Sequence, residues 1–183
     1  GNGGAIENVG GDLVVSESRV EMNQAADSFP LGGGIATSGA GSTLVISDSS
    51  ISNNNGGLGL GGGIYSDSIS MITGSTIANN SAGIGGGIGS NGNLTIQNST
   101  ISGNAASGPS GEGGGLYLTD GSTSTIESST ITQNSATFGG GGLYSYDFIG
   151  SATTNVKNSI IAGNATTSGD GADVSGGPTS LGN

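Results

Sequence analysis

The chain has 183 residues, of which 41 are glycine and none is histidine or cysteine. Thirteen acidic and two basic residues give a net charge of −11, so no basic surface for nucleic acid or an anionic membrane is present. The missing residue types exclude a disulfide scaffold, thiolate metal sites and Ser-His-Asp or Cys-His catalysis. No apolar run is long enough to cross a membrane, and we expect no membrane insertion by this segment.

One pattern recurs along the chain: a glycine run with an apolar residue, a variable loop, two apolar anchors five residues apart, and an asparagine. The first anchors are Val15, Ile46, Ile72, Ile96, Ile126 and Val156. The second anchors are Val20, Ile51, Ile77, Ile101, Ile131 and Ile161. A serine always stands two residues before the second anchor: Ser18, Ser49, Ser75, Ser99, Ser129 and Ser159. An asparagine always stands three residues after it: Asn23, Asn54, Asn80, Asn104, Asn134 and Asn164.

The spacing and residue types of the repeat predict a β-solenoid. Successive serines are 31, 26, 24, 30 and 30 residues apart, which indicates stacked units with loop insertions. Leu94–Gln97 alternates apolar and polar residues, as a half-buried strand does. We therefore predict an all-β fold, a single-stranded right-handed parallel β-helix of about six coils, each with about three short strands.

The odd spacing between the anchors requires a corner, because both cannot lie on one face of a straight strand. We place it at Glu17, Asp48, Gly74, Asn98, Ser128 and Asn158. The serines are expected to point inward, and the asparagines to stack along the helix axis.

The domain organisation is predicted to be a single domain over residues 1–183. Residues 1–31 form an irregular first coil with five of the acids, residues 32–165 the regular coils, and residues 166–183 a frayed C-terminal segment. The chain opens and stops inside repeat-like sequence, so we expect a piece of a longer protein.

The few aromatic residues mark the candidate contact sites. Alternation turns Tyr65, Tyr117 and Tyr144 outward in one column, beside glycine. Such a column stiffens a sheet by cross-strand stacking or offers a contact face for a sugar or another chain. Tyr146 and Phe148 lie in an insertion that either folds over the core or binds a partner.

Neither catalysis nor a cofactor is predicted. Glu17 and Asp48 share a column, so a pair of carboxylates is conceivable there, but a charged corner of an acidic coil is the simpler interpretation. Calcium could be bound by loop carboxylates, namely Asp67, Asp120, Asp147 and the turn Asp170–Asp173. Their spacing, however, matches neither the EF-hand nor the nine-residue calcium repeat. We predict no catalytic residues and no metal site, with calcium possible but unassigned.

The repeat resembles bacterial surface β-helix proteins, in particular the repeats of polymorphic outer-membrane proteins with motifs GGA[ILV] and FxxN. Gly3-Gly4-Ala5-Ile6 matches the first motif; the other copies carry glycine at its third position, and Ile or Val replaces Phe in the second. The tail Asn158–Asn164, Ala172–Gly176 and Ser180–Asn183 also looks like the end of the β-helix in large secreted bacterial proteins with C-terminal anchors. The resemblance implies a secreted or surface-displayed adhesin-like or structural protein.

We therefore expect a non-enzymatic extracellular β-helix that serves as a rigid stalk, an adhesive segment or a fibre subunit. Its expected partners are further copies, through open coil ends or flat glycine faces, or surface carbohydrate or protein. The alternative is a polysaccharide-binding module, or a polysaccharide lyase or hydrolase, on the same scaffold.

Overall fold

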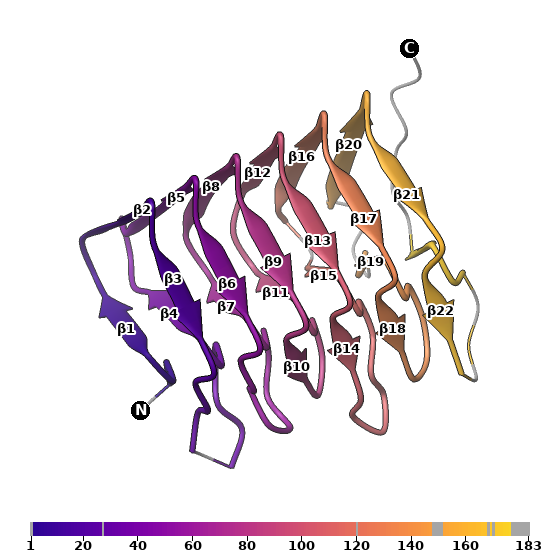
Figure 1. Cartoon of the computed structure of the whole chain (residues 1–183), viewed down its shortest axis with the longest axis horizontal. Helices are drawn as coiled ribbons and strands as arrows, with labels where there is room; N and C mark the ends of the chain where they lie inside the picture. Colours follow the sequence, from indigo (N-terminus) through magenta and orange to yellow (C-terminus); the bar gives the residue numbers. More distant parts are fainter. Residues whose placement is uncertain are drawn as a thin grey trace.

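The structure is a computed structural model and describes residues 2–26, 28–119, 121–147, 152–167, 169 and 171–176. All regular secondary structure in these residues is β-strand. The strands follow one another around successive coils that stack along the long axis of the molecule (Figure 1). The predicted all-β solenoid of about six coils is confirmed.

Equivalent strands of successive coils pair in parallel and form four sheets, which we call A to D. Sheet A contains β1 (Ile6–Val9), β4 (Ile35–Ser38), β7 (Ile64–Ser66), β11 (Ile88–Ser90), β15 (Leu116–Leu118), β19 (Leu143–Ser145) and β23 (Val174–Gly176). Sheet B contains β2 (Asp12–Ser16), β5 (Thr43–Ser47), β8 (Ile69–Thr73), β12 (Leu94–Gln97), β16 (Thr123–Glu127) and β20 (Thr153–Lys157). Sheet C contains β3 (Arg19–Glu21), β6 (Ser50–Ser52), β9 (Thr76–Ala78), β13 (Thr100–Ser102), β17 (Thr130–Thr132) and β21 (Ile160–Ala162). The short sheet D contains β10 (Ser81–Ala82), β14 (Ala105–Ala106), β18 (Ser135–Ala136) and β22 (Ala165–Thr166).

The corner between the anchors lies where the repeat predicts it. All six corner residues have φ between 46° and 58°, the left-handed conformation that turns the chain from sheet B into sheet C. A second left-handed column, directly before each ladder asparagine, turns the chain out of sheet C: Met22, Asn53, Asn79, Gly103, Gln133 and Gly163. The sequence pattern did not predict this second column or the fourth sheet.

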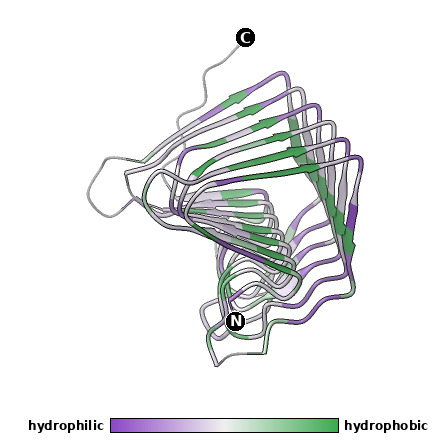
Figure 2. Ribbon diagram, turned by 90° about the vertical axis from the view of Figure 1, so that its left-hand side faces the viewer, coloured by the Kyte–Doolittle hydropathy of each residue, from purple (hydrophilic) through white to green (hydrophobic). Residues whose placement is uncertain are grey.

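The core consists of stacked apolar columns inside the coils (Figure 2). Ile96 of sheet B, Ile101 of sheet C and Leu116 of sheet A are each 0% exposed. Each lies in register with its equivalents in the neighbouring coils. Because like residues stack on like, a thin core can be filled by a few isoleucines and leucines per coil.

The six asparagines form a continuous hydrogen-bonded column, which we call the asparagine ladder. The backbone N–H and the side-chain Nδ2 of Asn80 both donate to Oδ1 of Asn104, at 2.9 and 3.0 Å. Its Nδ2 also donates to the carbonyl oxygen of Ile51, at 2.9 Å. The same bonds join each successive pair from Asn23 to Asn164. Every amide inside the ladder thus has its donors and its acceptor satisfied away from water.

The serines form a second column, the serine ladder. The backbone N–H of Ser75 donates to Oγ of Ser99 at 3.1 Å, and the Ser99 hydroxyl donates to the carbonyl of Gln97 at 2.7 Å. The same arrangement joins Ser18, Ser49, Ser129 and Ser159. The hydroxyl therefore stabilises the corner that follows sheet B.

The glycine runs of coils two to six are buried, whereas Gly3 and Gly4 of the first coil are not. A Cβ on Gly114 would lie 2.3 Å from the carbonyl oxygen of Ser135, and one on Gly86 would lie 2.4 Å from the carbonyl carbon of Ala105. The first strand of each coil therefore begins where two backbone segments nearly touch, which leaves no room for a side chain.

In-register pairing extends beyond residues 32–165 on both sides. In the first 31 residues, β1, β2 and β3 pair with β4, β5 and β6 of the next coil. After residue 165, β23 pairs with β19, placing Val174 beside Leu143. The described strands form one stack.

Candidate functional site

The outward column of sheet A carries the predicted tyrosines in one register. Tyr65 pairs with Gly89, Gly89 with Tyr117, and Tyr117 with Tyr144. The rings of Tyr117 and Tyr144 stack, with centroids 5.8 Å apart and planes 7° apart. Such a pair contributes about 0.5–1.5 kcal/mol beyond its buried area. Both rings are half-buried, so part of each remains open to solvent.

Tyr65 lies apart from this stack because Gly89 supplies no ring between them. Its side chain is only 6% exposed, and Asn91 Nδ2 donates to its hydroxyl at 2.8 Å. Burial, and then the negative charge of Asp67, raise the pKa of Tyr65. Its ring is thus part of the packing on sheet A and does not offer an open face. Phe148, the other predicted contact residue, lies outside the described residues.

Glu112 completes the site, and the sequence interpretation missed it. The residue directly before each glycine run forms a column of bridges along the stack: Leu31, Leu60, Ile84, Glu112 and Gly139. Glu112 is the one charged residue of that column, and this is the signal that could have revealed it. Its carboxylate is hydrogen-bonded to Tyr144, whose phenol is the donor.

Partial burial governs the electrostatics of this pair. Burial raises the pKa of Glu112, and the hydrogen bond from Tyr144 opposes that rise. The pKa of Tyr144 is raised by burial, then by the charge of Glu112, with a further contribution from Tyr146. Tyr146 is 39% exposed. We call Glu112, Tyr117, Tyr144 and Tyr146 the tyrosine patch; it offers aromatic surface beside one partly desolvated carboxylate.

We predict that Glu112→Gln raises the melting temperature at neutral pH. The folded state holds the pKa of Glu112 above its ordinary value of 4.5, so it favours the protonated form and is penalised when the carboxylate is charged. Wild-type stability should therefore rise as pH falls from neutral toward 4.5, and the gap to the variant should close. Thermal unfolding followed by circular dichroism at several pH values measures this.

The matched control is Glu7→Gln, at an exposed glutamate on β1, which should change the melting temperature little. A lower melting temperature for Glu112→Gln at neutral pH would contradict the prediction. It would mean that the charged form of the bond to Tyr144 outweighs the cost of burial.

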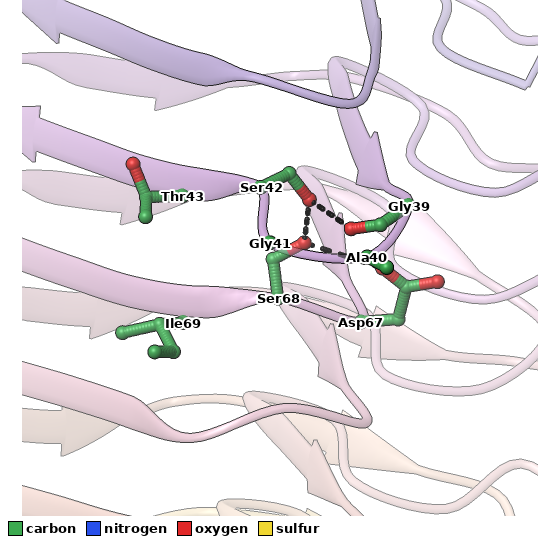
Figure 3. A pocket seen from close by; sticks show the side chains of 8 residues that line it. All are labelled: Gly39, Ala40, Gly41, Ser42, Thr43, Asp67, Ser68 and Ile69. Atoms are coloured by element: carbon green, nitrogen blue, oxygen red, sulfur yellow. Dashed lines mark hydrogen bonds between the residues drawn. The ribbon is translucent and has the colours of Figure 1, made fainter.

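Glu17 and Asp48 stand at equivalent, exposed corner positions of adjacent coils, as the shared column predicted. A surface hollow of about 350 Å³ lies between coils two and three, lined by residues 39–43 and 67–69 (Figure 3). There the Ser42 hydroxyl lies 2.6 Å from the carbonyl oxygen of Gly39 and is hydrogen-bonded to Ser68, whose hydroxyl lies 3.2 Å from Asp67 Oδ1. Asp67 is the one carboxylate that lines the hollow.

No group of three or more Asp and Glu side chains that could hold a metal ion occurs among the described residues. Asp120 and Asp170 fall outside them. The described part of the chain also contains no helix that could span a membrane.

The stacked parallel coils with their inward ladders define the class of protein: a parallel β-helix repeat protein. The family model described as the right-handed beta helix region matches residues 59–183, and the chain belongs to this family. Its coils are accordingly right-handed, as the sequence predicted. No curated protein and no solved structure is significantly similar to the chain.

Proposed function

We propose that this protein is a non-enzymatic, extracellular β-helix that acts as a rigid structural or adhesive segment. The observation that supports it best is the unbroken asparagine ladder, in which two hydrogen bonds at 2.9–3.0 Å join the side chains and backbone of each rung to the next. These bonds are buried, so water does not compete with them. A stack whose coils are joined in this way resists bending and pulling along its axis.

The extracellular part of the proposal is supported by the resemblance of the repeat to surface-displayed β-helices. In this role the chain would hold an adhesive surface away from the cell, and the tyrosine patch is the surface we assign to contacts with carbohydrate or protein.

A second candidate is a polysaccharide-binding module, or a lyase or hydrolase, on the same scaffold. The tyrosine patch favours it, because the half-exposed ring of Tyr144, which stacks on that of Tyr117, lies beside the carboxylate of Glu112. Aromatic rings pack against the apolar faces of sugar rings, and a carboxylate accepts hydrogen bonds from sugar hydroxyls.

One experiment separates the non-enzymatic proposal from a polysaccharide lyase or hydrolase, and it also tests the tyrosine patch as a binding surface. The protein is incubated with a panel of neutral and acidic polysaccharides, and both binding and product formation are measured, the latter as new reducing ends and as ultraviolet absorbance of unsaturated uronates. We expect no product. If a polysaccharide binds, Tyr117→Ala should weaken binding by about fivefold or more.

The matched control is Phe29→Ala, which removes an aromatic ring that is 74% exposed and lies outside the tyrosine patch. It should leave the affinity unchanged. Turnover of any polysaccharide would overturn the non-enzymatic proposal, and equal losses in the two variants would remove the tyrosine patch from the binding surface.

A further inference from the structure

The asparagine ladder ends on an aspartate that is not part of the repeat. The backbone N–H and the Nδ2 of Asn164 both donate to Oδ1 of Asp173, at 3.0 Å each. In every other rung the same two donors bond to Oδ1 of the asparagine in the following coil. Asp173 follows Asn164 by only nine residues, whereas successive ladder asparagines are 24 to 31 residues apart.

The position of Asp173 within its coil explains how it reaches the ladder. The segment 171–174 has the register of 140–143, and Gly171 repeats the left-handed φ of Gly140. Asp173 therefore stands where the third glycine of each run stands. A Cβ on that glycine would lie 2.7–3.1 Å from Nδ2 of the asparagine in the same coil: Gly34 on Asn54, Gly63 on Asn80, Gly87 on Asn104, Gly115 on Asn134 and Gly142 on Asn164.

A side chain at the position of the third glycine thus projects into the space that the ladder asparagine of the same coil occupies. In the first six coils the asparagine fills that place; the residue at the glycine position is Ala5 in the first coil and glycine in coils two to six. Asp173 fills it with its own carboxylate. A further coil with the same Ser-x-Ile-x-x-Asn pattern cannot place its asparagine there while Asp173 remains.

The rest of this end of the described stack is formed by the edge strands of sheets B, C and D. Among the described residues, β20, β21 and β22 have no strand on their far side. Val156 and Ile161 are partly exposed there, whereas Ile126 and Ile131 of the preceding coil are at most 1% exposed. Unpaired strand edges with apolar residues pair readily with further strands.

We propose that residues 171–176 act as an intramolecular stopper that keeps the first coil of a second copy from stacking onto this end. The second copy fits because its first coil carries the same pattern, with Ser18, Val20 and Asn23 at the matching positions. Among the described residues, Asn23 Oδ1 accepts no ladder bond, so it can receive the two donors that Asp173 now occupies. The stopper sets the association state of the protein.

The test measures association and stability together, by sedimentation velocity over a wide concentration range and by thermal unfolding. Asp173→Ala should lower the melting temperature by about 3–8 °C, because Asn164 loses the acceptor for two donors, and should associate as concentration rises. Asp173→Asn keeps the acceptor oxygen and should stay close to wild type in both measurements. Adding Asn23→Ala to Asp173→Ala should suppress the association.

Three results would overturn the proposal. One is an unchanged melting temperature in Asp173→Ala. Another is an Asp173→Ala protein that loses stability yet stays monomeric at every concentration. The third is association of the wild type equal to that of Asp173→Ala.

Discussion

Asn104→Ala is expected to lower the free energy of unfolding by about 3–5 kcal/mol, well above the ~1 kcal/mol of an average substitution. Asn104 is 0% exposed. Its removal leaves the backbone N–H and the Nδ2 of Asn80 without their acceptor, and it leaves the carbonyl oxygen of Ile77 without its donor. Each buried group left unsatisfied costs about 1–3 kcal/mol. Urea unfolding followed by circular dichroism measures the change.

The matched control is Asn155→Ala, which removes the same amide from an outward position on β20. It should cost less than about 0.5 kcal/mol, as surface substitutions usually do. Equal losses in the two variants would show that the ladder contributes little to stability and would weaken the proposed rigidity of the stack.

The ladder and the core could be predicted because they are periodic. Ile101 and Asn104 occur at fixed offsets in every repeat, and fixed offsets in a solenoid become columns in space. The corner at Asn98 followed from the odd spacing between two inward residues, which no straight strand permits. These predictions use only the period of the chain, so variable loop lengths do not disturb them.

The residues that break the period could not be placed in the same way. Glu112 contacts Tyr144 of the following coil, and that contact depends on the path of the loop before Glu112 and on the side-chain rotamers. Asp173 enters the ladder after nine residues, where the repeat predicts a full coil. Each of these residues differs from its equivalents in the other coils. Glu112 marks the tyrosine patch, and Asp173 marks the end of the asparagine ladder.

The glycine runs show a different limit of sequence interpretation. A run such as Gly113–Gly115 suggests a flexible or flat surface, because it has no side chains. In the structure it is buried between the backbone of sheet D and that of the next coil. That crossing involves residues about twenty positions apart, and the sequence pattern did not predict sheet D.

Gly114→Ala is therefore expected to destabilise the fold by about 3 kcal/mol or more, at the upper end of overpacking substitutions. Its Cβ would lie 2.3 Å from the carbonyl oxygen of Ser135 and 2.4 Å from that of Gly141. Both atoms belong to backbone, and Ser135 is held in β18 between β14 and β22. Neither can move aside without breaking sheet D, so the coil must open locally.

The matched control is Gly121→Ala, at a loop glycine with φ of 78° and no atom within 4 Å of a new Cβ. It should cost only the left-handed conformation, about 1–2 kcal/mol. Urea unfolding of both variants, with the far-ultraviolet circular dichroism of each folded state, separates the two effects. Suppose that Gly114→Ala lowered the free energy of unfolding no more than Gly121→Ala. The backbone around Gly114 and that of Ser135 would then have room to move apart. The close approach of these segments would not explain why glycine occupies this position in each coil.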